Sequence, residues 1–211
     1  EAVVAQSREG VEQWMRGLDK VEVILGEARF VAPGRLRVGE RELRAPRIFL
    51  NVGARAARPP LDGIDRVPTL DNQSILRLDT LPRHLVIIGG SYIGLEFAQV
   101  MRRFGARVTV VEKSARLLPR EDEDVAQAIR EILEREGVRF ELGAECIALA
   151  PRQSGIAVGA RCERRPPRLV GSHVLLAVGR QPNTEGLNLG VAGIETDPRG
   201  YIRVDEQCRT S

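Results

Sequence analysis

Between residues 84 and 112 the apolar positions follow three successive patterns, and each pattern predicts one element. Residues 85–88 form an uninterrupted apolar run, typical of a strand buried on both faces. After a glycine-rich turn, apolar residues recur every three or four positions from Tyr92, which predicts a helix that ends at Gly105. Its expected buried stripe consists of Ile93, Phe97, Val100 and Phe104. Residues 108–111 are a second buried strand, which ends at Glu112.

Shorter elements are predicted before this strand–turn–helix–strand unit. Residues 1–18 carry apolar side chains at helical spacing. Four apolar runs separated by turn residues predict a small antiparallel meander. These runs are residues 21–25, 30–31, 36–38 and 47–52. The proline-containing stretch 58–68 predicts an irregular crossing toward another domain.

Beyond Glu112 the pattern predicts a second helix and further strands. The acidic run at residues 121–124 favours a helix start, and Gly137 favours its end. The expected buried face of this helix consists of Val125, Ile129, Ile132 and Leu133. Residues 138–142 are predicted to be a third parallel strand, and residues 174–178 a further buried strand. A three-stranded meander is expected from residues 146–150, 156–160 and 169–170, and a short strand from residues 201–204.

The turn at residues 89–94 has the composition of a phosphate-binding loop. Gly89 permits the tight turn, and Gly94 lets the helix pack closely on the strand. Ser91 stands at the second glycine of the pattern G-x-G-x-x-G, where a small residue lets a pyrophosphate approach the backbone. The free N–H groups at the helix start favour phosphate. The predicted cofactor-binding residues are Gly89, Gly90, Ser91, Tyr92, Ile93 and Gly94; the alternative is a purely structural turn.

Glu112 lies 18 residues beyond Gly94, where an acidic residue meets the adenosine ribose of a dinucleotide. A carboxylate accepts hydrogen bonds from the ribose hydroxyls of NAD, and repels a 2′-phosphate by about 4 kcal/mol per unit charge. Lys113, Arg116 and Arg120 could neutralise such a phosphate, or could belong to a solvated loop. We expect these three residues to belong to a solvated loop. Lys113 is included among the predicted NAD-binding residues, and NAD(H) is expected in preference to NADP(H).

Composition excludes several classes of function. The chain has 211 residues, 43% hydrophobic and 29% charged, enough for a real core. A net charge of +3 and an aromatic content of 4% argue against nucleic-acid binding. No apolar stretch reaches membrane length and no signal peptide is visible, so a cytoplasmic location is expected. Cys146, Cys162 and Cys208 are widely spaced, so we expect three reduced thiols, with neither a metal site nor a redox dithiol.

Several motifs in a fixed order resemble a known family. They read GGSYIGLEFA, VTVVE, EDEDV, AVGRQPNT and GYIRVDEQCRTS. They resemble the flavin-dependent pyridine nucleotide–disulfide oxidoreductases, among them dihydrolipoamide dehydrogenase, glutathione reductase and mercuric reductase. The stretch RIFLNVGARAARPPLDGI is most similar to mercuric-reductase-like members. The resemblance runs from about residue 21 to the last residue.

This resemblance implies an α/β fold in which a Rossmann-like NAD(P)-binding domain is inserted in an FAD-binding domain. Residues 1–79 would be part of the FAD domain, and residues 184–211 would return to it. Residues 80–183 would form the NAD(P) domain, with a parallel sheet, flanking helices and a β-meander. The implied activity passes hydride from NAD(P)H, with NADH favoured, to FAD and on to a disulfide or a metal acceptor such as Hg(II). The whole protein is expected to be a homodimer.

The resemblance also implies roles for individual residues. The residues expected to lie against FAD are Gly53 and Ala54. Tyr92 would be the aromatic residue that covers the flavin and moves when nicotinamide binds. Glu96 would lie near the nicotinamide carboxamide. Gly179 and Arg180 would lie where nicotinamide meets flavin.

Three family features are absent from these 211 residues. They are the FAD fingerprint G-x-G-x-x-G near the N-terminus, the redox pair C-x-x-x-x-C, and the C-terminal His/Glu acid–base pair; the two histidines, His84 and His173, precede buried strands. The chain is therefore interpreted as an internal piece of a longer protein, inactive by itself and without catalytic residues of its own.

Two other functions stay open at this stage. One is a flavin NADH oxidase or ferredoxin-reductase-like enzyme without a redox disulfide, and the other is a non-catalytic nucleotide-binding module. A self-contained dehydrogenase with a Tyr-x-x-x-Lys pair is excluded, because the residues four positions beyond Tyr92 and Tyr201 are Glu96 and Asp205.

Overall fold

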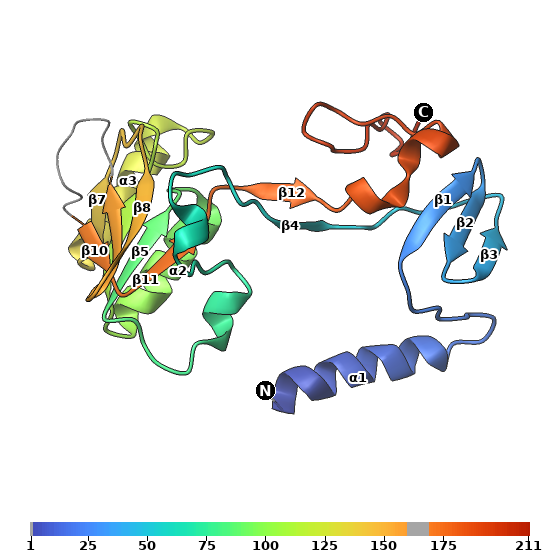
Figure 1. Cartoon of the computed structure of the whole chain (residues 1–211), viewed down its shortest axis with the longest axis horizontal. Coiled ribbons are helices and arrows are strands. Elements are labelled where there is room, and N and C mark those ends of the chain that lie inside the picture. The colour runs from blue at the N-terminus through green and yellow to red at the C-terminus, as the bar shows by residue number, and fades with distance from the viewer. Residues whose placement is uncertain (1, 160–168) are drawn as a thin grey trace. The chain divides into compact units, whose positions relative to one another are not determined.

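The computed structural model describes residues 2–159 and 169–211. Figure 1 labels many of the helices and strands along the chain. They belong to two compact units, of which the first comprises Glu1–Gly53 with Pro182–Ser211 and the second Ala54–Gln181. In the described part, no helix has the length and apolarity that a membrane span needs. Cys162 and residue 160, the last of a predicted strand, lie outside the described residues.

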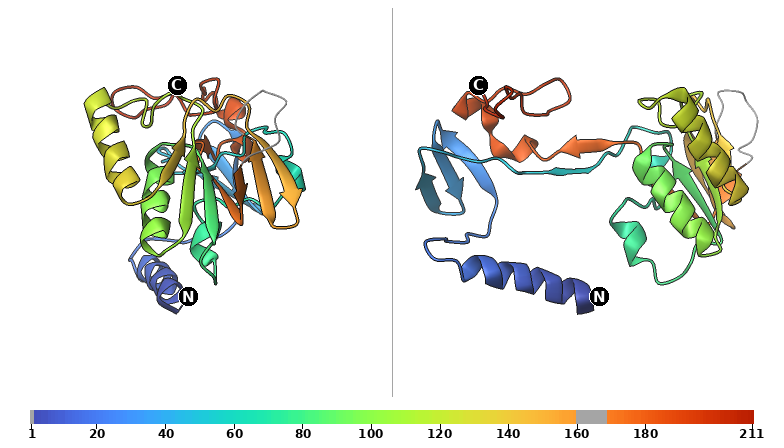
Figure 2. Two further views of the ribbon diagram at one scale, coloured as in Figure 1. Left: turned by 90° about the vertical axis from the view of Figure 1, so that its left-hand side faces the viewer. Right: turned by 180° about the vertical axis from the view of Figure 1, so that it is seen from behind.

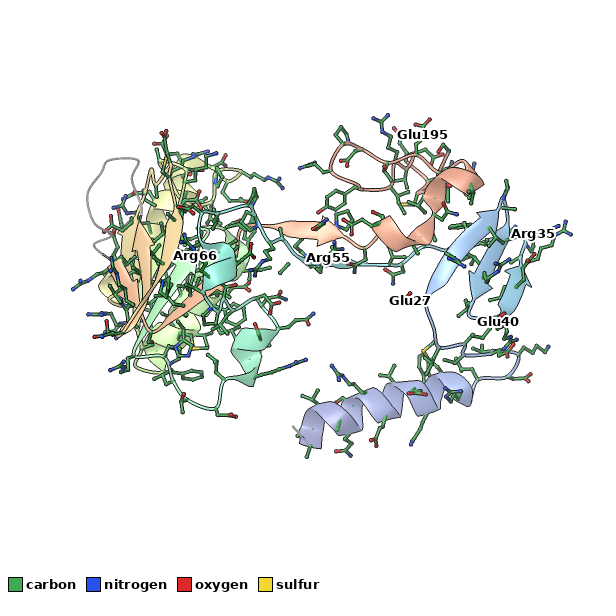
Figure 3. The ribbon with its side chains drawn as sticks, in the orientation of Figure 1. Glu27, Arg35, Glu40, Arg55, Arg66 and Glu195 are labelled. Atoms are coloured by element: carbon green, nitrogen blue, oxygen red, sulfur yellow. The ribbon has the colours of Figure 1, made fainter. Side chains whose placement is uncertain are left out.

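Among its described residues, the first unit contains one α-helix and a three-stranded antiparallel sheet (Figure 1). The helix is α1 (Ala2–Arg16), as the apolar spacing predicts. The strands are β1 (Ala28–Ala32), β2 (Arg35–Val38) and β3 (Arg41–Arg44), in that order across the sheet. Arg35 on β2, labelled in Figure 3, pairs with Glu42 on β3 at 3.3 Å.

The predicted meander is confirmed for β1 and β2 but wrong elsewhere. Residues 21–25 and 47–52 are not strands. The third strand is the polar segment Arg41–Arg44, which pairs along its whole length with β2 and places Leu43 opposite Leu36. A polar edge strand of this kind has too few apolar residues to show the alternation of apolar and polar positions from which a strand is predicted. The predicted strand at residues 201–204 is reduced to a single bridge between Thr196 and Ile202.

The return segment of the first unit packs on its sheet. Two short 3₁₀ helices, η3 (Glu185–Leu187) and η4 (Leu189–Ala192), contact β1. Between them, the Asn188 side chain donates a hydrogen bond to the carbonyl oxygen of Phe30 at 3.1 Å. Phe30 is only 2% exposed, so this contact closes the small core of the unit.

A four-stranded parallel sheet forms the centre of the second unit. Its order is β11 (His173–Leu176), β5 (His84–Ile88), β6 (Arg107–Val111) and β7 (Arg139–Glu141). Every residue of β5 is buried, as expected for a strand covered on both faces. The predicted strand–turn–helix–strand unit and the further parallel strands are confirmed.

Two different layers cover the faces of this sheet (Figure 2). The helices α2 (Tyr92–Arg103) and α3 (Glu123–Arg135) lie side by side on one face, over alternate strand residues such as Leu85 and Ile87. The antiparallel meander β10–β9–β8 covers the other face, over Val86 and Ile88. Its strands are β8 (Ala148–Arg152), β9 (Gly155–Gly159) and β10 (Leu169–Gly171). The predicted three-stranded meander is thus confirmed.

The predicted buried faces of both helices are right only in part. Phe97 of α2 and Ile129 of α3 pack against the core, and Leu133 of α3 belongs to it. The residues of α2 that are buried are Gly94, Leu95, Ala98 and Met101. Val100 and Phe104 of the predicted stripe are 43% and 69% exposed. The face of α2 that carries the small residues Gly94 and Ala98 lies against the sheet instead. In α3 the buried residues are Ala126 and Leu133, while Val125 and Ile132 are each 43% exposed.

Residues 54–79, assigned from the sequence to the first domain, pack within the second unit. The segment contains β4 (Ala54–Ala56), η1 (Ile64–Arg66) and η2 (Ser74–Arg77). Leu70 donates its N–H to the carbonyl of Val174 at 2.7 Å and accepts the N–H of Leu176 at 2.8 Å. Arg66, labelled in Figure 3, pairs with Asp62 at 3.3 Å. These contacts describe packing only, so the assignment of residues 1–79, 80–183 and 184–211 to cofactor domains stays a prediction.

The cysteines differ from the expectation of three reduced thiols. Cys146 is disulfide-bonded, a pairing that its spacing in the sequence does not reveal. Cys208 is an exposed thiol. Among residues 2–159 and 169–211, no group of three His, Cys, Asp or Glu side chains is placed to bind a metal ion.

Candidate functional site

The glycine-rich turn joins β5 to α2 at the carboxyl edge of the parallel sheet. Gly89 has φ +112°, and a Cβ there would overlap the carbonyl oxygen of Ala177, the residue after β11. The N–H of Gly89 donates to the carbonyl of Val111 at 2.9 Å, and that of Ala177 donates to Ile88 at 2.7 Å. The turn therefore needs glycine and lies at the ends of three strands, where α/β proteins bind ligands.

Gly94 brings α2 against this turn. A Cβ at Gly94 would overlap the carbonyl oxygen of Gly89 and would lie 3.4 Å from the Ala177 side chain. Ser91 precedes α2 as its N-cap, with extended backbone and no capping hydrogen bond from its side chain. The first N–H groups of an α-helix have no intrahelical acceptor, so those of Tyr92 and Ile93 are oriented to bind an anion.

Glu112 lies directly after β6 and faces the same turn. Its Oε2 accepts the N–H of Gly90 at 2.5 Å, and its Oε1 accepts the N–H of Ser114 at 2.7 Å. A Cβ at Gly90 would lie 2.6 Å from the Leu117 side chain and 3.1 Å from Cβ of Glu112. Each carboxylate oxygen keeps a further lone pair for a ligand hydroxyl. The structure thus fixes an acidic acceptor beside the helix N-terminus.

The basic residues after Glu112 do not converge on its carboxylate. Lys113 and Arg120 are exposed. The Arg116 guanidinium donates to the carbonyl oxygen of Pro119 at 2.9 Å, within the same loop. This arrangement is that of a solvated loop.

A pocket of about 110 Å³ adjoins the turn. It is lined by Ala56, Asn72, Ser91, Tyr92, Ile93, Leu176, Ala177, Gly179 and Arg180. It brings together two groups of predicted site residues, the start of α2 and Gly179 with Arg180, which are more than 80 residues apart in the chain. A larger hollow, of about 510 Å³, lies at the amino edge of the sheet near Arg83 and His173 and contains none of the predicted residues.

The remaining predicted residues lie in different surroundings. Glu96 is exposed on α2 and does not line the pocket. Gly179 has φ +120° and accepts the N–H of Ala57 at 3.0 Å, while the Arg180 side chain donates to the carbonyl of Ala54 at 2.6 Å. In the first unit, Gly53 has φ +66° and accepts the N–H of Asn183 at 3.1 Å.

Tyr92 lies at the first position of α2, with its side chain partly in solvent. The residue is 52% exposed, and its hydroxyl donates a hydrogen bond to the carboxylate of Glu121. That hydrogen bond is the main reason why the pKa of Tyr92 lies above its ordinary value; partial desolvation and the charge of Glu121 act in the same direction, and Arg120 opposes them.

Four residues that line the pocket are not among those predicted from the sequence, namely Ala56, Asn72, Leu176 and Ala177. Leu176 and Ala177 could have been found, because the carboxyl ends of parallel strands converge on a ligand crevice. Ala56 and Asn72 come from an irregular segment, for which the sequence carries no periodic signal.

The family model described as pyridine nucleotide-disulphide oxidoreductase matches residues 2–211. The chain belongs to this family. The resemblance seen in the motifs is thereby confirmed, together with the α/β, Rossmann-like fold and the classification as an oxidoreductase. The family is one of flavoproteins that use pyridine nucleotides.

Individual members of the pyridine nucleotide-disulphide oxidoreductase family match almost the whole chain. The probable pyridine nucleotide-disulfide oxidoreductase RclA of Escherichia coli K12 is 37% identical over 199 residues, 92% of this chain and 44% of that protein. Dihydrolipoyl dehydrogenase 3 of Pseudomonas aeruginosa is 38% identical over 213 residues, 96% of this chain and 44% of that protein. The structure of the HOCl-induced flavoprotein disulfide reductase RclA from Escherichia coli has a TM-score of 0.91 at 36% identity, over 100% of this chain and 48% of that one. The chain therefore spans less than half the length of these relatives.

Proposed function

We propose that the second unit binds NADH at the turn of residues 89–94, with the adenosine ribose on Glu112. The observation that carries this proposal is the carboxylate of Glu112, held 2.5 Å from the Gly90 N–H at the start of the phosphate-binding turn. A dinucleotide extended along the sheet edge would place its pyrophosphate on the N–H groups of Tyr92 and Ile93. Its nicotinamide would then reach the pocket beside Gly179.

The preference for NADH over NADPH follows from charge. A 2′-phosphate next to Glu112 would meet a fixed negative charge, which costs about 4 kcal/mol per unit charge near a protein surface. The Arg116 guanidinium donates to the carbonyl oxygen of Pro119, so binding a 2′-phosphate would cost it that hydrogen bond. Lys113 would contribute only long-range attraction for the pyrophosphate.

In the whole protein we propose that hydride passes from NADH to FAD, and electrons then pass to a disulfide or a metal acceptor such as Hg(II). FAD supplies the redox chemistry when bound. Gly179 and Arg180 would lie where nicotinamide meets flavin, and Glu96 would lie near the nicotinamide carboxamide. Tyr92 would cover the flavin and move when nicotinamide binds. Gly53 and Ala54 would lie against FAD. We also propose that the whole protein is a homodimer and that it is located in the cytoplasm.

The experiment that tests nucleotide binding is a parallel calorimetric titration with NADH and NADPH at one salt concentration. We expect tighter binding of NADH by the wild-type chain and loss of most of that binding in Glu112→Ala. Tighter binding of NADPH would contradict the ribose role of Glu112. Binding of neither nucleotide would contradict the proposed site.

A further inference from the structure

Each of the four parallel strands begins with a basic residue, at the edge of the sheet opposite to the glycine-rich turn. These residues are His173 on β11, His84 on β5, Arg107 on β6 and Arg139 on β7. Burial is the main reason why the pKa of His84 is lowered, and the charges of Arg107 and Arg139 act in the same direction. This amino edge therefore carries a positive potential, which a bound anion would offset.

The hollow of about 510 Å³ opens at this edge, and three separate segments of the second unit line it. They are the residues before β5 (Thr80, Leu81, Arg83), the turn from β8 to β9 (Ser154, Gly155) and the entry to β11 (Ser172, His173). The lining thus combines a guanidinium, an imidazole and three hydroxyl groups. The volume is that of a small-molecule site, since such sites span about 300–1,000 Å³.

Close backbone contacts hold these segments together. The Ser172 N–H donates to the carbonyl oxygen of His84 at 2.8 Å, and the Ser172 hydroxyl accepts the N–H of His84 at 3.1 Å. Gly155 has φ +144°, and a Cβ there would overlap the carbonyl oxygen of Gly171. The walls of the hollow are therefore fixed before a ligand arrives, so little conformational freedom is lost on binding.

The basic side chains of the hollow have capacity for a ligand. Arg83 is exposed, and none of residues 2–159 and 169–211 accepts a hydrogen bond from its guanidinium. Nδ1 of His173 lies 3.1 Å from the Ser172 hydroxyl, whereas Nε2 has no hydrogen-bond partner in the described part of the chain. None of the described residues that line the hollow is acidic; Asp79, next to Thr80 in the sequence, is exposed and does not line it.

We propose that this hollow binds a small phosphorylated molecule, whose phosphate lies on Arg83 and His173. The guanidinium donates two parallel N–H groups, which would occupy both oxygens of a carboxylate. A phosphate has a third terminal oxygen, which is left for the imidazole or a hydroxyl of the hollow. The volume that remains, with the hydroxyls of Thr80 and Ser154 on its wall, suits a hydroxyl-bearing body such as a polyol.

This site is separate from the one that we propose for NADH. The two lie at opposite ends of β5, which has five residues and therefore spans about 16 Å. A phosphate bound at the turn of residues 89–94 would accordingly not contact His173. The proposal also needs no flavin and no residue outside this chain.

The two histidines of the chain, His84 and His173, allow a local test. Proton NMR gives one set of imidazole signals for each, and His173→Gln assigns them. We expect glycerol phosphate, added at constant ionic strength, to shift the His173 signals saturably, and glycerol to leave them unchanged. Inorganic phosphate is expected to give a similar shift with about three- to tenfold weaker affinity, because it lacks hydroxyls that reach Thr80 and Ser154.

A matched pair of variants tests the role of the guanidinium. Arg83→Gln is expected to weaken the binding of glycerol phosphate by about tenfold or more, because a charge-assisted, bidentate contact is lost. Arg8→Gln removes the same charge from the exposed helix α1 of the first unit and is expected to leave the affinity unchanged. The signals of the buried His84 ring report in each variant whether the second unit is folded.

Each alternative outcome would overturn the proposal. A wild-type chain without a saturable shift at His173, or an unchanged affinity in Arg83→Gln, would exclude the site. Equal affinities for inorganic phosphate and glycerol phosphate would replace the phosphorylated molecule by the free ion. None of these measurements involves NADH, so their failure and the failure of the proposed function are distinguishable.

Discussion

The Glu112 carboxylate accepts the backbone N–H of Gly90 at 2.5 Å, which joins the end of β6 to the turn after β5. The same side chain accepts the N–H of Ser114 at 2.7 Å. It therefore contributes to the shape of the turn and supplies the acceptor that we assign to the adenosine ribose. One substitution can separate these two contributions.

We expect Glu112→Gln to weaken NADH binding by about tenfold or more, because hydrogen bonds to a charged acceptor are worth about 1.5–3 kcal/mol. The amide oxygen of glutamine can still accept one backbone N–H, so the turn is retained. Binding of NADPH should fall less, or rise, because the repulsion of the 2′-phosphate is removed. Calorimetric titration of both nucleotides measures this. Glu123→Gln, an exposed residue of α3, is the control for net charge, and an equal loss for NADH and NADPH would refute the ribose assignment.

Gly94 allows α2 to approach the turn, so Gly94→Ala is expected to destabilise the second unit. The new Cβ would overlap the carbonyl oxygen of Gly89, and backbone cannot move aside as a flexible side chain can. Overpacking of this kind costs about 1–3 kcal/mol. Urea denaturation followed by circular dichroism, with hydrogen exchange of the α2 amides, measures the loss. Gly186→Ala is the control, since its Cβ would meet no atom within 4 Å. Equal stability of the two variants would refute the close-packing role of Gly94.

His84 begins β5 and is 5% exposed. Its Nδ1 lies 2.8 Å from the carbonyl oxygen of Val170, and its Nε2 lies 2.9 Å from the hydroxyl of Thr109. Burial lowers the pKa of His84 below its ordinary value of 6.5; the hydrogen bond to Val170 opposes this shift, and the charges of Arg107 and Arg139 reinforce it. The neutral ring is therefore the form that the fold stabilises.

Stability should consequently depend on pH through His84. Below pH 6.5 the unfolded chain binds a proton that the folded chain resists, so the free energy of unfolding falls as pH drops from about 6.5 through the folded pKa. Urea denaturation at a series of pH values measures this slope. His84→Gln should lower stability at neutral pH and flatten the slope. A slope unchanged in His84→Gln would assign the pH dependence to other groups.

The sequence was sufficient for elements with a strong local signal. The run at residues 85–88, the glycines at 89 and 94, and the run at 108–111 specify strand, turn and strand by themselves, and all three are found. Glu112 was placed by its spacing alone, and its carboxylate does face the turn. The elements at the centre of the second unit are therefore predictable from the local sequence alone.

Features that depend on packing could not be predicted in this way. The predicted apolar stripe of α2 holds for Phe97, which packs against the core, but not for Val100 and Phe104, which are exposed. Gly94 and Ala98 give the helix a closer approach to the sheet than bulky residues do. Asn72 reaches the pocket from an irregular segment, and the contact of Tyr92 with Glu121 spans 29 residues. Each of these depends on where distant segments meet, which no periodicity in the sequence encodes.

Binding and turnover should be separable in this chain. We expect the 211-residue chain to bind NADH without steady oxidation of it, because these residues contain no C-x-x-x-x-C pair and no His/Glu pair. Both histidines are first residues of strands in the parallel sheet, where His84 is committed to Thr109 and Val170. The measurement is NADH absorbance over time, with added FAD and either a disulfide or Hg(II) as acceptor, and a dihydrolipoyl dehydrogenase as positive control. Sustained NADH consumption that is lost in Glu112→Ala would contradict this expectation, and would show that these residues complete a catalytic cycle by themselves.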